Sequence, residues 1–320
     1  MPKADLHLHL EGAMRPETLA DLSDAHGEPT PQVANYSSFD QFQHCYRAVV
    51  KMIRTRADLR RLVREVVEDA AVSGTVWIEP HFNPATYAPA LGSVDEVLDL
   101  VLETGLAAGE PLGVGFGLTL SASRNRDPRH ATDLARLAAA YAGRGVVTFG
   151  LAGDETAGSA EAFKDAFTIA RDAGVIIAPH SGELVGGATL RNALDALVPD
   201  RIGHGIRAIE DQMLLEHLAD AQITLDICLT SNRALGVVRD TKEHPLPRIL
   251  ESGVRCSLGS DDPLLLGTSL LAEYRLARSQ LELVDSQLAA LARTSIQSSG
   301  APDHILTRAL HGIDAWLGES

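Results

Sequence analysis

Hydrophobic and polar residues form two kinds of pattern along this chain, one typical of strands and one typical of helices, and the two alternate. Short apolar runs rich in β-branched residues have the length and composition of β-strands. They are residues 3–10, 75–82, 113–122, 146–153, 174–181, 201–205, 223–230 and 254–260. Between them, apolar residues recur at helical spacing in 58–73, 93–108, 130–143, 159–173, 188–197, 210–219 and 245–252. This alternation predicts parallel strands joined by right-handed helical crossovers.

The number of runs sets the expected architecture. Eight strand-like runs in 320 residues favour an α/β fold of the closed (β/α)8 kind, the TIM barrel. A doubly wound open sheet is the alternative, but the first run is not followed by the Gly-x-Gly-x-x-Gly sequence usual in nucleotide-binding sheets. Residues 269–317 continue as helical segments that we expect to pack outside the barrel. Because no linker or low-complexity tract interrupts the chain, we expect one domain over residues 1–320.

Composition narrows the class of protein. A net charge of −15 argues against nucleic acid as a partner, since phosphates would be repelled. No apolar run is long enough to cross a bilayer, and the first residues lack the apolar stretch of a signal peptide. We therefore expect a cytoplasmic protein with no membrane partner. Cys45, Cys228 and Cys256 form no Cys-x-x-Cys pair, so neither a disulfide framework nor a thiolate zinc site is predicted, and Cys228 and Cys256 are expected in the core.

Candidate chemistry begins in the first run, "KADLHLHLEG". Strand geometry places His7 and His9 on one face about 7 Å apart, where two imidazoles can bind one metal ion. The same pattern also fits two unrelated histidines on a polar strand face.

Polar residues at the ends of other runs favour the metal site. In a TIM barrel the catalytic groups gather where the strands end. Four runs end in imidazoles or carboxylates, namely His9 and Glu11, His180 and Glu183, His204, and Asp261 and Asp262. Each motif alone is more often structural, but their convergence on one rim predicts an active site.

These residues resemble a known family. In order along nearly the whole chain, "HLHLEG", "GLAGDE", "HSGE", "RIGHG", "LTSN" and "SDDP" look like the motifs of the adenosine deaminase-like branch of the metal-dependent amidohydrolases. The resemblance implies a hydrolase that removes the amino group from a 6-aminopurine.

The resemblance also implies a metal centre. It makes His7, His9, His180 and Asp261 the ligands of one Zn2+ per chain, a donor set that suits zinc. Binuclear relatives hold a second ion with a lysine at the end of the fourth strand, and this chain has none there. Such an ion lowers the pKa of its bound water to about 7.

The remaining roles follow from the same resemblance. Glu183 would give a proton to ring nitrogen N1, and a low-dielectric pocket would raise its pKa in the needed direction. His204 would orient the attacking water and take its proton. Asp262 would contact N7, and the backbone N–H of Gly153 would meet N3, where a side chain would obstruct the approach.

Two positions bear on the substrate. Adenine deaminases of this family generally carry aspartate where this chain has Gly203, and a glycine leaves room for a ribose. Glu11 stands where adenosine enzymes usually have an aspartate that reaches the ribose 5′-hydroxyl, so the 5′ region should differ. We therefore expect a small-molecule adenine nucleoside, adenosine or a 5′-modified adenosine. The alternatives are 6-aminodeoxyfutalosine of menaquinone synthesis and free adenine.

Several other polar or aromatic residues receive structural interpretations. We expect Asp154 and Glu155 to form salt bridges at the barrel rim, and Ser231 and Asn232 to fix a loop through bonds to the backbone. Trp77 should pack in the barrel, with His81 and Phe82 as candidate pocket residues, and no role is assigned to His244. Residues 29–45 are expected to form a lid-like loop over the pocket. The sequence does not indicate an oligomeric state.

The alternative to an enzyme is a barrel that binds a nucleoside or a metal without catalysis. It is disfavoured because every candidate catalytic position holds a chemically competent residue.

Overall fold

The strands of this chain all pair in parallel. The computed structural model describes residues 1–33 and 36–318. Within these ranges the strands are β1 (Lys3–Asp5), β2 (Thr75–Ile78), β3 (His81–Phe82), β4 (Gly115–Phe116), β5 (Leu118–Ser123), β6 (Val146–Ala152), β7 (Ile176–Ser181), β8 (Arg201–His204), β9 (Thr224–Ile227) and β10 (Arg255–Leu258). Each predicted run contains a strand, and two runs are interrupted, at 79–80 between β2 and β3 and at Gly117 between β4 and β5.

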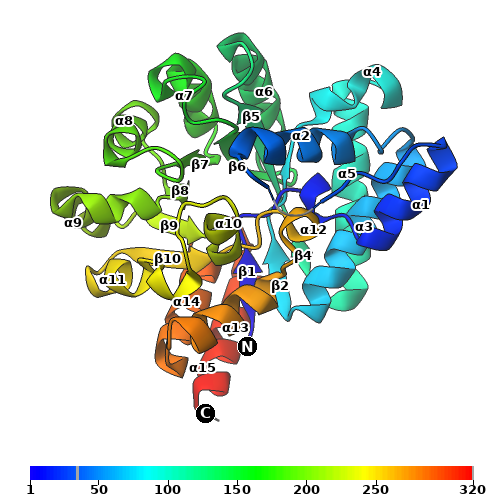
Figure 1. Ribbon diagram of the computed structural model, residues 1–320. Helices are drawn as coiled ribbons and strands as arrows, with labels where there is room; N and C mark the ends of the chain where they lie inside the picture. Colours follow the sequence, from blue (N-terminus) through cyan, green and yellow to red (C-terminus); the bar gives the residue numbers. More distant parts are fainter. Residues whose placement is uncertain (34–35, 319–320) are drawn as a thin grey trace.

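The pairing continues around a ring (Figure 1). One ladder runs β1-β2-β4, and the other runs β10-β9-β8-β7-β6-β5-β3. A bridge between Leu8 and Asp261 joins the segment after β1 to the end of β10, and a bridge between His9 and His81 joins that segment to β3. The predicted (β/α)8 barrel is thereby confirmed.

The first run is a shorter strand than expected. It was predicted over 3–10, but β1 ends at Asp5. Beyond it the backbone divides its hydrogen bonds between two neighbours, since His9 N donates to Asp261 O at 2.8 Å and Leu10 N donates to His81 O at 3.1 Å. A segment that serves two neighbours in turn forms single bridges instead of one continuous ladder.

Helices surround the ring of strands. The predicted helices correspond to α3 (Arg56–Val72), α5 (Val94–Gly109), α6 (Pro128–Tyr141), α7 (Lys164–Asp172), α8 (Gly187–Leu197), α9 (Gln212–Asp220) and α11 (Leu246–Glu251). The C-terminal segments are α13 (Leu270–Gln280), α14 (Asp285–Gln297) and α15 (Asp303–Gly318), and they pack outside the barrel as expected. Helix α14 lies against β1 and β10, so it takes the place of the eighth barrel helix.

Within residues 1–33 and 36–318, five further helices were not predicted, and one of them corrects the expected lid loop. They are α1 (Pro16–His26), α2 (Phe39–Val50), α4 (Ala88–Leu91), α10 (Leu229–Ala234) and α12 (Pro263–Leu266). Of the predicted loop 29–45, residues 34 and 35 lie outside the described ranges. The part from Phe39 onward is helical, because Ser38 caps α2 by accepting the Gln41 N–H at 3.2 Å and apolar residues follow at helical spacing.

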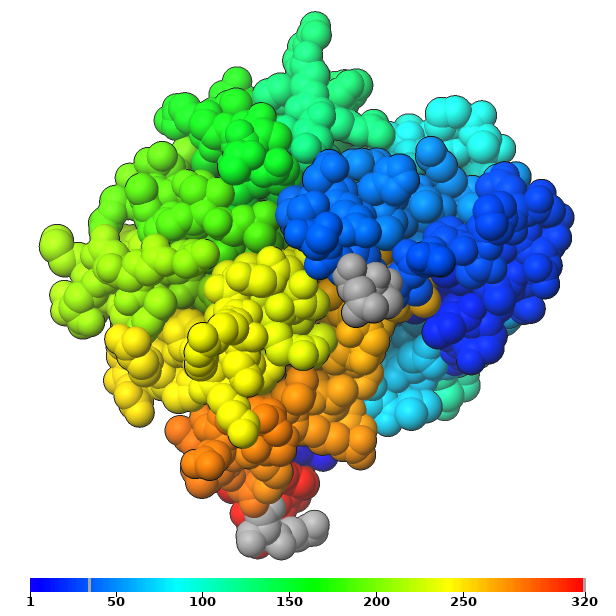
Figure 2. Space-filling view, in the orientation of Figure 1, coloured from blue at the N-terminus to red at the C-terminus, as the bar shows by residue number. Residues whose placement is uncertain are grey.

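Helices α2, α10 and α12 lie in front of the centre of the ring in Figure 1. In the space-filling view of the same face, α2 (blue) is flanked by the green part of the chain on one side and by the yellow part, with α10, on the other (Figure 2). No helix within the described ranges is both long and apolar enough to cross a membrane.

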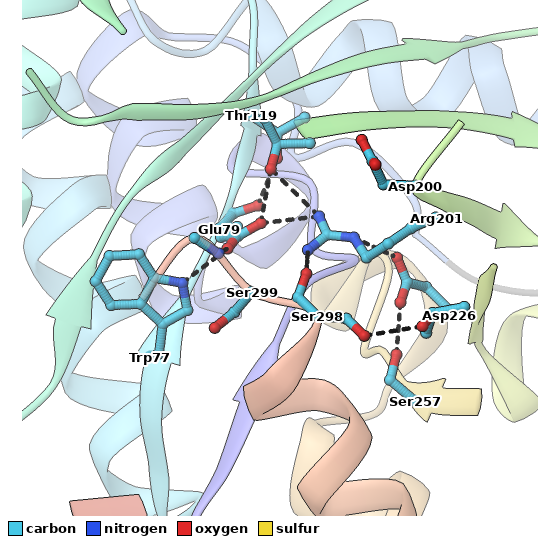
Figure 3. Close-up of polar contacts among 12 residues, drawn as sticks. Trp77, Glu79, Thr119, Asp200, Arg201, Asp226, Ser257, Ser298 and Ser299 are labelled. Carbon is cyan, nitrogen blue, oxygen red and sulfur yellow. Dashed lines mark hydrogen bonds and ion pairs between the residues drawn. The ribbon is translucent and has the colours of Figure 1, made fainter. Parts of the chain in front are cut away.

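A buried polar network ties several strands together inside the barrel (Figure 3). Arg201 is 1% exposed, its Nη2 donates to Glu79 Oε2 at 2.8 Å, and its Nε lies 3.3 Å from Asp226 Oδ2. Trp77 donates its indole N–H to Glu79 Oε1 at 2.8 Å and is buried, as predicted. Arg201 Nη1 also donates to Ser298 O at 2.7 Å, which joins the network to the end of α14.

Candidate active site

Three imidazoles and one carboxylate converge at the ends of β1, β7 and β10. His9 Nε2 lies 3.2 Å from His180 Nε2 and 3.4 Å from Asp261 Oδ1. His7 Nε2 lies 3.6 Å from the same oxygen. Ligands about 2.1 Å from a tetrahedral zinc ion are about 3.4 Å from one another, and the observed separations match that spacing. The donor set and its spacing therefore fit a divalent cation.

The backbone between the first and last strands places two of these groups. Asp261 N donates to His7 O, and Asp261 O accepts from His9 N, both at 2.8 Å. Asp261 has a φ of 59°, in the left-handed region that costs a residue with a side chain roughly 1–2 kcal/mol. The backbone pairing across the barrel holds the carboxylate against both imidazoles despite this cost.

His204 and Glu183 lie beside this cluster. His204 Nε2 is 3.5 Å from Glu183 Oε2 and 3.9 Å from Asp261 Oδ2. His204 ends β8 with a φ of 63° and is 1% exposed. The structure thus brings together the imidazole and the carboxyl group that the sequence assigned to water and to the purine ring.

Glu155 holds the loop that carries Glu183. Its carboxylate accepts four consecutive backbone N–H groups, from Gly182 at 2.6 Å, Glu183 at 3.1 Å, Leu184 at 2.7 Å and Val185 at 3.1 Å. The predicted rim salt bridges of Asp154 and Glu155 are therefore wrong. Within the described residues neither forms an ion pair, and Asp154 Oδ1 instead accepts from the backbone and hydroxyl of Thr156.

Burial sets the protonation of the carboxyl groups. It raises the pKa of Glu183 well above its ordinary value, and the charges of Asp261 and Glu155 act in the same direction. Burial and the neighbouring Asp261 also raise the pKa of Asp262 well above its usual range. Although burial acts to raise it, the neighbouring charges of His7, His204 and His9 bring the pKa of Asp261 well below its usual range.

Close backbone approach explains two glycines of the site. A Cβ on Gly12 would lie 1.7 Å from Asp262 Oδ1, so Gly12 allows Asp262 to occupy its place. Gly153 has a φ of 99°, and a Cβ there would lie 2.4 Å from Asn125 Oδ1.

A cavity of about 460 Å3 opens in front of these groups. Its inner wall contains His9, His81, Phe82, His180, Glu183, His204, Asp261 and Asp262. Helix α2 lines the cavity with Phe39, Phe42, Gln43, Tyr46, Arg47 and Val50, and the lining also includes Gly153, Asn125 and Arg126. From the sequence, a loop over residues 29–45 was expected to cover the pocket, and no helix was expected there.

Glu11 lines the cavity and already has two partners. Its Oε2 accepts from Tyr46 Oη and its Oε1 from Tyr87 Oη, both at 2.9 Å. Tyr46 belongs to α2, so this contact joins the helix to the floor of the cavity. Burial raises the pKa of the Glu11 carboxyl group.

Gly203 does not provide room for a ribose, which corrects the sequence prediction. A Cβ there would lie 2.9 Å from His7 Cε1 and 3.2 Å from His180 Cγ, so the position faces two imidazoles of the cluster. Gly203 is not among the described residues that line the cavity. Cys228 and Cys256 are buried as expected, and Cys228 Sγ lies within 4.8 Å of ligand atoms of His7 and Asp261.

The contacts predicted for Asn232 and Ser231 are wrong. Asn232 lies in α10 and its side chain contacts His204 and His244, not a loop backbone. Ser231 Oγ has no hydrogen-bond partner within the described chain. His244, to which the sequence gave no role, is 3% exposed. The only signal in the sequence was the position of His244 in "EHPLP", just before the predicted helix 245–252.

Comparison with known proteins agrees with this geometry. The family model described as "Adenosine deaminase" matches residues 2–316. A Streptomyces coelicolor protein with the provisional name adenosine/adenine deaminase is 43% identical over 332 residues, which cover 99% of this chain and 97% of that protein. An aminodeoxyfutalosine deaminase from Acidothermus cellulolyticus is 34% identical, covering 87% and 82% of the two chains. The crystal structure of an adenine deaminase from Arthrobacter aurescens superposes with a TM-score of 0.91 at 28% identity, covering 99% of both chains.

Proposed function

The chain belongs to the adenosine deaminase family and is a hydrolytic deaminase, and we propose that its substrate is an adenine nucleoside, converted to the 6-oxo product and ammonia. The observation that carries this proposal is the convergence of His204, Glu183 and Asp262 on one cavity beside the His/Asp cluster. A cavity of about 460 Å3 lies in the range of small-molecule sites, about 300–1,000 Å3. That volume accommodates a nucleoside and exceeds the need of a free base.

The cluster would hold one divalent cation, which we propose is zinc. His7, His9, His180 and Asp261 supply the three nitrogens and one oxygen, and His7 Nε2 has no hydrogen-bond partner within the described chain. When bound there, such an ion activates water as the nucleophile at neutral pH.

Two orphaned oxygens support the way the purine is held. Glu183 Oε1 and Asp262 Oδ1 are buried and lack hydrogen-bond partners within the described residues, although buried polar atoms nearly always have one. A purine in the cavity would supply both partners. The protonated Glu183 carboxyl group would donate to N1 as the ring accepts the nucleophile, and Asp262 would contact N7.

His204 and Gly153 complete the proposed arrangement. His204 orients the attacking water from its place beside Glu183. The backbone N–H of Gly153 meets N3, and its close contact with Asn125 leaves no space for a side chain.

The outer cavity favours an anionic group on the 5′ side. Arg47 and Arg126 line it, and neither guanidinium has an ion pair or hydrogen bond within the described part of the chain. The carboxylates of the lining, such as Glu11, belong to its inner part. This separation of charge favours 6-aminodeoxyfutalosine, which carries a carboxylate at its 5′ end, as the second candidate. A relative of that name aligns over most of the chain.

Free adenine stays the third candidate, because the correction at Gly203 removes one argument against it. The test is ammonia release by the purified protein, with its bound metal, from adenosine, 6-aminodeoxyfutalosine and adenine. We expect the better nucleoside to exceed adenine in kcat/KM by about tenfold or more. Turnover of adenine alone would overturn the nucleoside proposal, and no release from any of the three would overturn adenine compounds as the substrate class.

Substitution of the two arginines provides a second test, which distinguishes 6-aminodeoxyfutalosine from adenosine as the substrate. Replacing both, R47Q with R126Q, should lower kcat/KM for 6-aminodeoxyfutalosine by about tenfold and leave adenosine within about threefold. An equal loss for both substrates would show that the arginines do not recognise an anion.

A further inference from the structure

A line of three buried side chains leads away from His204 on the side opposite the cavity. Asn232 Nδ2 lies 3.2 Å from His204 Nδ1, and Asn232 Oδ1 lies 3.1 Å from His244 Nε2. The far nitrogen of His244, Nδ1, lies 3.1 Å from the backbone N of Leu246. His204, Asn232 and His244 are 1%, 0% and 3% exposed, so the whole line is sealed from solvent. Each contact therefore needs one donor and one acceptor.

The backbone at Leu246 fixes the direction of every bond in this line. A backbone N–H can only donate, so His244 Nδ1 must be unprotonated. An imidazole with a bare Nδ1 is neutral and carries its proton on Nε2, which donates to Asn232 Oδ1. Burial favours the same neutral form, since it lowers the pKa of His244 to about 3. Asn232 must then present its amide nitrogen to His204.

The final step concerns His204. Because Asn232 Nδ2 donates, His204 Nδ1 must accept and is unprotonated. The proton of the neutral ring is on Nε2, the nitrogen that lies 3.5 Å from Glu183 Oε2 beside the cavity. Amide orientation and histidine tautomer are normally assigned by inference, and here one backbone N–H determines both.

We infer that Asn232 and His244 are positioning residues that hold His204 in the tautomer protonated at Nε2, so that His204 meets the reacting water as a hydrogen-bond donor. This rests on the proposed deaminase site. With a divalent cation at the His/Asp cluster, the pKa of the water would fall to about 7 and its proton would pass to solvent before the attack. His204 then has no vacant nitrogen on the cavity side and does not take that proton, in contrast to the role that the resemblance implies. It orients the water and stabilises negative charge on oxygen by donation.

The tautomer can be observed directly. Protonated and unprotonated imidazole nitrogens of a neutral histidine give well-separated 15N signals. In the full-length protein labelled with 15N-histidine and carrying its bound metal, we expect His204 and His244 each to show a protonated Nε2 and an unprotonated Nδ1. Comparison with an H204Q sample assigns the His204 signals. A protonated Nδ1 on His204 overturns the inference, whatever substrate the enzyme uses.

A substitution of matched shape tests the consequence for catalysis. N232D keeps the size of the side chain but presents only acceptors, so His204 Nδ1 must become the donor. We expect the 15N signals of His204 to exchange roles and kcat to fall by about tenfold or more, with a smaller change in KM, because a wrongly held tautomer is severely costly in catalysis. The control N192D adds the same charge on the exposed face of α8 and should leave kcat unchanged.

If Asn232 had only a structural role, N232D would not change the tautomer of His204. N232D that keeps kcat within about twofold and leaves the His204 signals unchanged overturns the inference. If N232D fails to fold, the wild-type spectrum still decides. Absence of any deaminase activity alongside the expected spectrum would count against the proposed function and leave the tautomer assignment intact.

Discussion

The carboxylate of Glu155 accepts the backbone N–H of Glu183 at 3.1 Å, so one buried acid holds the main chain of another. The same carboxylate also accepts the N–H groups of Gly182, Leu184 and Val185. This loop follows directly on His180 at the end of β7. Glu155 therefore couples the proposed proton donor to the proposed metal ligand without touching either side chain.

Replacing Glu155 by glutamine should disturb this loop. E155Q turns an amide NH2 toward N–H donors, and loss of charge-assisted bonds should destabilise the fold by about 2–3 kcal/mol. We expect kcat to fall by about tenfold or more because Glu183 is released from its position. Urea unfolding and steady-state kinetics would measure the two effects. The exposed E161Q is the control, and an E155Q enzyme with wild-type kcat would contradict the role given to Glu155.

Removal of the metal should abolish turnover and weaken the fold. His7, His180 and Asp261 are buried and His9 is partly buried, and their ligand atoms are spaced at 3.2–3.6 Å. A cation bound only by the folded state stabilises that state by mass action. A strong chelator should lower both activity and the thermal midpoint, and zinc should restore both. Metal-free protein that retains its turnover would refute the metal-dependent mechanism.

The Arg201 network should make a large contribution to stability. R201M removes the cation and leaves Glu79 and Asp226 buried without their partner, which should cost about 3–5 kcal/mol. The matched control R239M breaks only a surface pair with Glu243 and should change the unfolding midpoint little. Similar midpoints for the two variants would show that the buried charges find other compensation.

Gly12 should be essential to the site although it carries no chemistry. In G12A the new methyl group would overlap Asp262 Oδ1, whose predicted contact is N7 of the purine. We expect kcat/KM to fall by about tenfold or more, since a displacement near 1 Å can cost about a hundredfold. G318A adds a methyl group where no atom lies within 4 Å and serves as the control. Normal kinetics for G12A would show that Asp262 can move without harm.

The barrel could be predicted because its sequence pattern, an apolar run followed by an amphipathic helix, is repeated. The helices over the cavity, α2, α10 and α12, have no repeated pattern. Each βα unit shows an apolar run followed by an amphipathic helix, so an error in one unit does not change the pattern. Helix α2 and the short α10 and α12 occur once each. The polar stretch before Phe39 resembles a loop, and only the contact of Tyr46 with Glu11 reveals why the helix lies over the cavity.

The site divides in the same way. His7, His9, His180 and Asp261 follow strands whose ends must meet, so topology alone predicts their convergence. Their roles, and that of zinc, stay predictions. Asn232 and Glu155 act through contacts with distant backbone and side chains, and no local pattern in the sequence reports those contacts.

The final prediction concerns acid stability and depends on His244. Burial lowers its pKa to about 3, whereas an unfolded histidine titrates near about 6.5. Between these pH values His244 is protonated in the unfolded chain and neutral in the folded chain. The free energy of unfolding must therefore fall as pH falls through this window. The slope for one such group approaches about 1.4 kcal/mol per pH unit. Above about pH 6.5 both states hold the neutral ring, and the contribution no longer changes.

Comparison with H244Q isolates this group. Glutamine does not titrate and can still donate to Asn232 Oδ1, while every other ionisable residue is common to both proteins. Urea unfolding at intervals from about pH 7 to about pH 4 should show wild-type stability declining faster than that of H244Q. Parallel declines would mean that the His244 ring becomes protonated without loss of its contacts. That result would also contradict the unprotonated Nδ1 on which the tautomer of His204 depends.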